Sequence, residues 1–190
     1  MSFDWLELQR TAIRGFTDRL ATVTDWAAST PDTEWDVARL VEHMVDEQRW
    51  IPPLLSGMTV PDAEASLAPI GDDLRAEWSR YAETASIAWA ATAPDAPVHL
   101  SYGVVPCLDY LKQQVADIAI HTWDLACGVG GDDRLDPDLV AAVWADIEPQ
   151  RDMLASSGLF ADPVSVPDDA PLQDRLLALT GRDPRRGDTP

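Results

Sequence analysis

The stretch PCLDYLKQQVADIAIHTWDLAC, residues 106–127, decides the fold class of this chain. Proline suits the first turn of a helix and glycine the residue after the last turn, so the whole stretch is predicted to be one helix that ends at Gly128. The residues around Asp117 and before His121 are almost all apolar. This pattern indicates that the middle of the helix is buried.

Four other segments carry helix signals. The first has apolar residues at a spacing close to 3.6, the second follows the N-cap residue Asp36, and Pro52 is expected to end that second helix. Long helices without any alternation of strands and helices favour an all-α fold, a helix bundle. The four predicted helices cover residues 3–28, 36–51, 72–93 and 136–156.

The connections between these helices are predicted from their composition. Residues 56–70 are rich in small residues, proline and aspartate, which is typical of a loop. The stretch VHLSYGVV, residues 98–105, is expected to be extended, as a short strand or an ordered loop.

The C-terminal part is predicted to be a short tail, residues 158–190, packed on a bundle domain of residues 1–157. A short strand is one option near residues 163–166, and an amphipathic helix is expected over residues 171–179, stopped by a glycine. The final residues, RDPRRGDTP from 182 onward, are expected to be frayed.

Charge and composition exclude several classes of function. The net charge of −19 disfavours binding to nucleic acid and to anionic membranes. The N-terminus lacks a signal-peptide pattern, and no apolar run reaches the roughly 18 residues of a membrane-spanning helix. Two cysteines, Cys107 and Cys127, are too few for a disulfide scaffold. A soluble cytoplasmic protein, monomeric or a homodimer, is therefore expected.

The candidate site rests on two of the three histidines. Asp117 and His121 are four residues apart, so they lie one above the other on one helix face, and both are competent ligands for zinc or a similar ion. His43 lies among apolar residues in the middle of another predicted helix. A three-ligand site in the bundle core would join these residues. A buried Asp–His hydrogen bond and a satisfied core histidine are the alternatives.

Other residues are weaker candidates. Glu47 lies one turn beyond His43 and is read as a partner of the ligands or as a solvated charge. Asp124 follows His121 by three residues, where it either orients that ligand or is an exposed carboxylate. His99 is read as structural or surface.

The sequence resembles the DinB-like metal-binding four-helix bundles, and most of all the N-terminal domain of mycothiol-dependent maleylpyruvate isomerase. EWDVARLVEHMVDEQRW matches the first signature at Trp35, Leu40 and His43, and the second reads from Asp117 through HTWDLA. The tail GLFADPVSVPDDAPLQDRLLALTGRDP resembles an actinobacterial branch of largely unassigned function. The resemblance implies an up-and-down four-helix bundle whose metal is held by His43, Asp117 and His121.

Two functions from different classes follow. The resemblance implies a mycothiol-dependent S-transferase or isomerase in which a divalent metal, zinc first and nickel as the alternative, activates the thiol toward an electrophilic substrate. Trp50 and Tyr110 are expected to line the pocket from the facing of their helices. The alternative is a metal- or ligand-binding module without turnover, favoured by the short tail and by the lack of an obvious general acid or base. A metal-free structural core is the third option.

Overall fold

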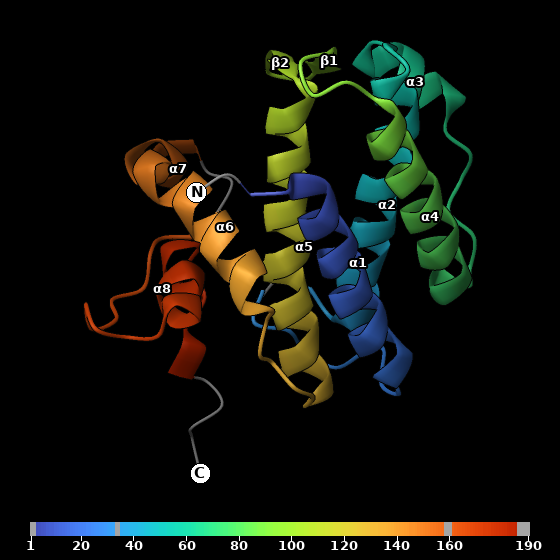
Figure 1. Ribbon diagram of the computed structural model, residues 1–190. Coiled ribbons are helices and arrows are strands. Elements are labelled where there is room, and N and C mark those ends of the chain that lie inside the picture. The colour runs from blue at the N-terminus through green and yellow to red at the C-terminus, as the bar shows by residue number, and fades with distance from the viewer. Residues whose placement is uncertain (1–2, 33–34, 158–160, 186–190) are drawn as a thin grey trace.

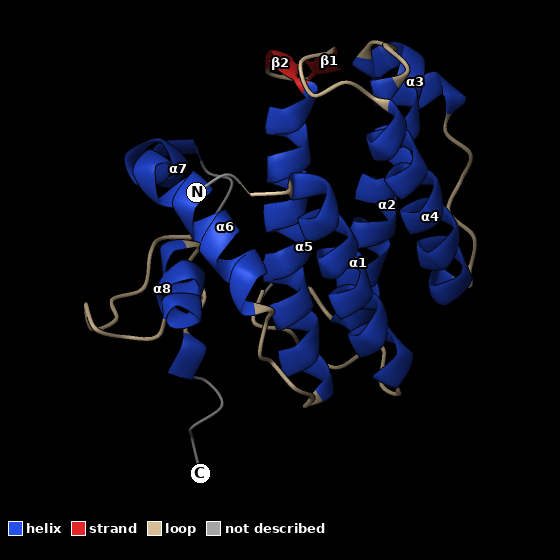
Figure 2. Ribbon diagram, in the orientation of Figure 1, coloured by secondary structure: helices blue, strands red, loops and turns tan. Residues whose placement is uncertain are grey.

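The computed structural model describes residues 3–32, 35–157 and 161–185, with side chains omitted for 155–157. Figure 2 shows that helices dominate the described chain, with one small sheet at one end of the bundle. The predicted all-α bundle is therefore confirmed. Helix α1 packs chiefly on α5, and α2 on α4 (Figure 1). The four long helices are α1 (Trp5–Thr22), α2 (Val37–Leu55), α4 (Leu74–Ala91) and α5 (Cys107–Val129).

The core between these helices is apolar and aromatic. Trp78, Trp89 and Trp123 are buried almost completely, and the ring of Phe16 lies 4.3 Å from that of Trp78 between centroids. Burying large aromatic rings supplies much of the driving force for folding. No helix in the described ranges combines the length and the apolar character that crossing a bilayer requires.

Helix α1 ends at Thr22, six residues earlier than predicted. The carbonyl oxygens of Leu20 and Val23 accept hydrogen bonds from the guanidinium of Arg75 on α4. The carbonyls of Trp26 and Ala28 then accept from the first N–H groups of α2. These partners satisfy backbone groups that a longer helix would have paired internally.

Two expectations about the region after α2 are wrong. Helix α2 continues through Pro52 and Pro53 to Leu55, because the prolines fall in its last turn and the Pro52 carbonyl still accepts from the Ser56 N–H at 3.0 Å. The predicted loop 56–70 contains a helix, α3 (Val60–Ser66). The side chain of Thr59 caps it, and proline stands in its first turn, so local signals begin a helix within a loop-like composition.

The hairpin before α5 confirms the extended prediction for residues 98–105. Strands β1 (Pro97–Leu100) and β2 (Gly103–Pro106) pair antiparallel, and His99 lies opposite Val104. Helix α5 ends two residues later than predicted, since Gly130 adopts the left-handed conformation (φ 65°). The Gly131 N–H donates to the Ala126 carbonyl at 2.8 Å, which closes the last turn.

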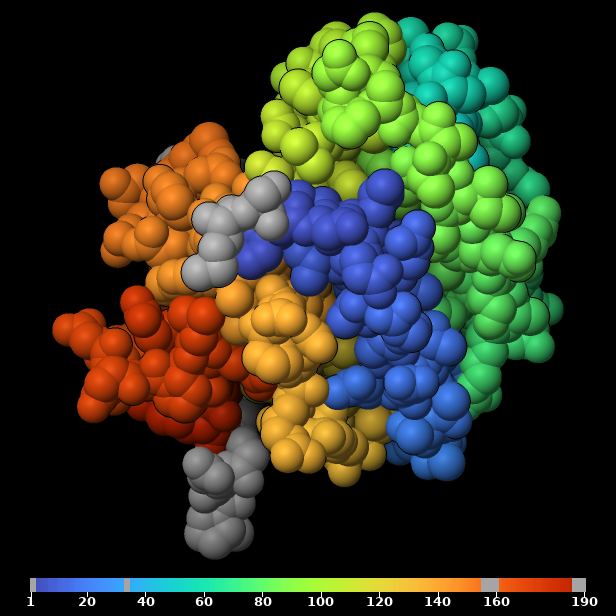
Figure 3. Space-filling model, viewed as in Figure 1, coloured from blue at the N-terminus to red at the C-terminus, as the bar shows by residue number. Residues whose placement is uncertain are grey.

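The predicted helix 136–156 is divided at Pro149, which lacks the N–H that a continuous helix needs. The pieces are α6 (Pro137–Ile147), a 3₁₀ turn η1 (Glu148–Gln150) and α7 (Arg151–Ser157). Helix α8 (Leu172–Leu179) confirms the amphipathic helix of the tail and packs on α6. In the space-filling view these orange and red segments form a lobe beside the bundle (Figure 3). The division at 157/158 remains a prediction.

Two expectations about the tail are corrected. Among the described residues 163–166 no strand forms, because the Val164 N–H donates instead to the Ala178 carbonyl at the end of α8. The end is not frayed at Arg182, which is buried against the bundle. Residues 186–190 lie outside the described chain.

Candidate metal centre

Two facing helices bring His43, Asp117 and His121 together, as the sequence predicted. His43 comes from the middle of α2, and the other two lie one turn apart on α5. His43 Nε2 is 3.7 Å from Asp117 Oδ2, and His121 Nε2 is 3.4 Å from Asp117 Oδ1. One ligand atom from each residue lies within 4.8 Å of the others. The three donors therefore converge on one point between α2 and α5.

The spacing and bonding of these donors fit a divalent metal ion. Ligand atoms about 2.1 Å from a tetrahedral zinc ion lie about 3.4 Å from one another. The two separations above, which end on different oxygens of Asp117, are of this size. Asp117 Oδ2 is buried and has no hydrogen-bond partner. A buried carboxylate oxygen without a partner is costly, and a cation would compensate it. Two imidazoles and one carboxylate form a donor set typical of zinc and of other transition metals.

Trp35 forms an aromatic wall beside the two imidazoles. Its ring centroid lies 4.6 Å from that of His43 and 5.6 Å from that of His121. It stands immediately before the N-cap residue Asp36, so the start of α2 fixes its position. The tryptophan ring therefore packs against both imidazoles on this side.

Asp124 orients His121. The side chain of Asp124 is fully buried, which excludes the alternative of an exposed carboxylate. Its Oδ2 lies 3.0 Å from His121 Nδ1. A carboxylate only accepts hydrogen bonds, so Nδ1 carries a hydrogen, which leaves Nε2, on the side of Asp117, as the nitrogen that would bind a metal ion. The sequence placed Asp124 in this role as one of two options.

The electrostatics of the cluster favour positive charge at its centre. Burial alone would lower the pKa of His121, but the carboxylates of Asp117 and Asp124 outweigh it and raise this pKa to about 9. Burial opposes ionisation of Asp117, yet His121 and His43 hold the pKa of that carboxyl well below its usual range. Asp117 therefore remains anionic, and a metal ion that bound here would displace a proton from His121.

Glu47 lies next to the ligands but is not one of the three converging residues. Its Oε2 accepts a hydrogen bond from Gln114 Nε2 at 2.8 Å. Burial, followed by the charge of Asp117, raises the pKa of Glu47. The side chain is thus half-buried and held by α5 beside the site. Its role there stays a prediction.

The two predicted pocket residues are not among the three converging residues, and one of them lies within electrostatic reach of the site. Tyr110 is buried, and its ring packs 5.2 Å from that of Trp89 between centroids. Burial, followed by the charge of Glu47, raises the pKa of Tyr110, so the phenol stays neutral. Trp50 is half-buried and packs against the core. Their part in a pocket remains a prediction.

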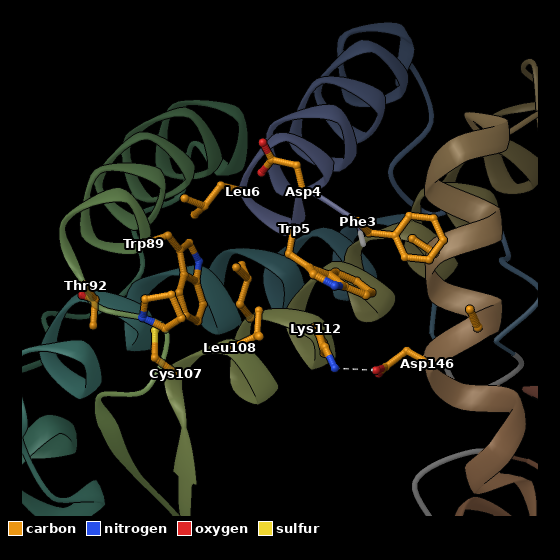
Figure 4. A pocket seen from close by; sticks show the side chains of 14 residues that line it. Phe3, Asp4, Trp5, Leu6, Trp89, Thr92, Cys107, Leu108, Lys112 and Asp146 are labelled. Atoms are coloured by element: carbon orange, nitrogen blue, oxygen red, sulfur yellow. Dashed lines mark ion pairs between the residues drawn. The ribbon is translucent and has the colours of Figure 1, made fainter. Parts of the chain in front are cut away.

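A separate cavity of about 530 Å³ opens near the start of α1 (Figure 4). Phe3, Trp5 and Trp89 line it, and Lys112 and Asp146 form an ion pair in its wall. Its lining, taken over the described residues, includes no member of the His43 cluster. The cavity and the candidate metal centre are thus two distinct places.

No sequence pattern places Arg182 near the site. Its guanidinium contacts Asp124, with 2.9 Å between Arg182 Nη2 and Asp124 Oδ2. The two residues are 58 positions apart, and arginine in a charged C-terminal stretch is normally solvated. Only the docking of α8 brings them together.

The fold and the three converging donors define a class, a helical bundle with a candidate two-histidine, one-carboxylate metal centre. The profile of the mycothiol maleylpyruvate isomerase N-terminal domain family matches residues 6–126, more than half of the chain. The chain belongs to this family, which confirms the resemblance inferred from its motifs.

Two solved structures share the fold. One is a mycothiol-dependent maleylpyruvate isomerase, 19% identical, and the other is a histidine-to-alanine mutant of such an enzyme, 18% identical. Each aligns with a TM-score of 0.60 over 76% of this chain and 68% of the solved chain. No curated protein matches the sequence.

Proposed function

We propose that this protein is a metal-binding, mycothiol-dependent S-transferase or isomerase. His43, Asp117 and His121 would hold a divalent ion, with zinc as the first choice and nickel as the alternative. The observation that carries the proposal is Asp117 Oδ2, a buried carboxylate oxygen without a hydrogen-bond partner between two histidines. Membership of a family named for a mycothiol-dependent enzyme supports the thiol as cosubstrate.

The metal ion and the residues of the chain would have different roles in the reaction. A bound divalent ion would supply Lewis acidity that lowers the pKa of a thiol, so that thiolate is present at neutral pH. The residues of the chain bind and orient that ion: Asp124 leaves Nε2 of His121 as the nitrogen that binds it, and Trp35 packs against the imidazoles. The partners would be a low-molecular-weight thiol and an electrophile, with no protein nucleophile needed.

Cobalt substitution tests this function directly. The protein loaded with Co²⁺ is titrated with mycothiol while its visible absorption is recorded. A thiol that joins the metal changes the absorption with 1:1 stoichiometry, whereas the His43→Ala/His121→Ala variant shows no change. A loaded protein whose spectrum is unaffected by saturating mycothiol would contradict the proposal.

The extent of the family match favours a second candidate, a non-catalytic metal- or ligand-binding module. The match ends at residue 126, and about a third of each solved isomerase lies outside the aligned part. A panel of electrophiles offered with mycothiol separates the two. Turnover by the metal-loaded protein supports the enzyme, and binding of metal and thiol without turnover supports the module.

A further inference from the structure

We propose that Arg182 is a positioning residue for the metal centre: through Asp124 it fixes the orientation of His121 and couples docking of the C-terminal tail to metal binding. This inference rests on the metal site of the proposed function. It adds a residue from outside the region that the family profile matches, residues 6–126.

The contact between Arg182 and Asp124 is buried and multiple. Arg182 Nη2 lies 2.9 Å from Asp124 Oδ2, and Nε lies 3.3 Å from the same oxygen and 3.4 Å from Oδ1. The side chains are 9% and 0% exposed. Asp124 Oδ2 is also the atom that faces His121 Nδ1. One carboxylate oxygen therefore joins the arginine to the candidate ligand.

Arg182 has two further polar contacts. Nη1 donates to the Thr180 carbonyl at 2.9 Å, and Nη2 lies 3.4 Å from Asp32 Oδ2. Asp32 precedes α2 and lies three residues before Trp35, the wall of the site. The guanidinium thus connects the tail to both α5 and the segment leading into α2, with a fixed planar geometry.

The local structure of the tail aims this arginine inward. The Arg182 N–H donates to the Leu177 carbonyl at 2.9 Å, and Gly181 adopts a left-handed conformation (φ 80°) that ends α8. A Cβ at Gly181 would lie 2.6 Å from the Cβ of Ala161, so a larger residue does not fit. The turn after α8 therefore packs closely against Ala161, and it places Arg182 against the bundle.

The role follows from what each group can do. A carboxylate held from one side by a guanidinium keeps a defined position, and the hydrogen on His121 Nδ1 then points to it. Without Arg182, Asp124 can rotate and the imidazole loses its fixed tautomer. Because binding energies are linked reciprocally, an arginine that improves metal binding must itself be held more firmly when the metal is bound.

Zinc affinity, measured by competition with a chelator, tests the role. Arg182→Gln is expected to weaken zinc binding by about 10- to 100-fold, and Arg182→Lys by less. Arg185→Gln, which removes an exposed arginine of the same tail paired with Asp183, is the matched control and should bind zinc as the wild type does. Wild-type zinc affinity in a folded Arg182→Gln variant would overturn the proposal. If that variant does not fold, the zinc affinity of Arg182→Lys is measured instead, and wild-type affinity there would overturn the proposal as well.

A double-mutant cycle with Asp124→Asn shows whether the arginine acts through the aspartate. Once Asp124 is replaced, Arg182→Gln should weaken zinc binding no further, because the connection is already broken. If the fold-losses of zinc affinity in the two single variants simply multiply in the double variant, the arginine does not act through Asp124, and the proposal is contradicted.

Two further readouts separate this inference from the proposed function. Zinc should slow amide hydrogen exchange in residues 172–182 of the wild type and less so in Arg182→Gln. In the metal-free protein above pH 9, where the His121 imidazole is neutral, ¹⁵N spectra should show the ring hydrogen on Nδ1 in the wild type and a tautomer mixture in Arg182→Gln. If the wild type binds no zinc, the proposed function fails while the tautomer still tests Arg182. An unchanged tautomer would overturn its positioning role.

Discussion

Helix α5 carries two ion pairs of equal length near its two ends, and their surroundings differ. Lys112 Nζ lies 2.9 Å from Asp146 Oδ1, with side chains 25% and 20% exposed. Arg182 Nη2 lies 2.9 Å from Asp124 Oδ2, with side chains 9% and 0% exposed. The first pair borders an open cavity (Figure 4), and the second adjoins the candidate metal centre.

Burial, and not the distance between the charged atoms, decides how much each ion pair contributes to stability. Where water reaches both groups, it replaces a lost partner, and the pair contributes little to stability. Where the groups are desolvated, removing one leaves the other charge without compensation. Only the buried pair is also bonded to a candidate ligand, so only there does a change in the pair reach the centre.

The largest effect is expected on removing the buried arginine. Arg182→Ala leaves the carboxylate of Asp124 buried without its cation, so the free energy of unfolding should fall by about 3–5 kcal/mol. Urea denaturation of the metal-free protein measures this, with Arg185→Ala as the exposed control. A loss below about 1 kcal/mol would show that Asp124 is compensated in another way.

The pH dependence of zinc binding tests the charge at the buried end of α5. His121 holds its proton in the metal-free protein because Asp117 and Asp124 raise its pKa to about 9, above the ordinary 6.5. Zinc must displace this proton, so its apparent affinity should rise by about tenfold per pH unit from pH 7 and level off above pH 9. A zinc affinity that is constant over this pH range would show that no proton is displaced from His121.

The stability of the metal-free protein should change with pH in the opposite direction to its zinc affinity. A raised histidine pKa adds stability that is complete below pH 6.5 and is lost as the pH rises through 9. Between these values the free energy of unfolding should therefore fall, and the His121→Gln variant should lack this part of the change. Urea titrations at several pH values measure it.

The smallest effect is expected at the open end of α5. Lys112→Ala should lower the free energy of unfolding by about 1 kcal/mol or less, because the pair with Asp146 is accessible to water and screened by salt. It should leave zinc affinity unchanged. A loss as large as that of Arg182→Ala would remove the distinction between the two pairs.

The three candidate ligands were predictable because their signals are local. Asp117 and His121 share a helix face through their spacing alone, and His43 stands out as a polar residue in an apolar helix. The helix starts followed in the same way from capping residues such as Asp36 and Asp136. Family motifs then joined the two helices into one site.

The remaining features depend on contacts that spacing does not encode. Arg182 reaches Asp124 only because α8 packs on α6 and Gly181 turns the chain. The early end of α1 depends on hydrogen bonds from Arg75, which lies 52 residues beyond Val23. Such tertiary partners override local preference, so they became visible only in the folded structure.

The metal content of the purified, untagged protein shows whether His43, Asp117 and His121 bind a metal ion. It is measured beside the His43→Ala/His121→Ala variant, with circular dichroism to show that both are folded. We expect about one divalent ion per chain in the wild type and almost none in the variant. A wild type that takes up no metal, even when zinc or nickel is offered, would contradict this expectation and leave His43, Asp117 and His121 as a structural polar cluster.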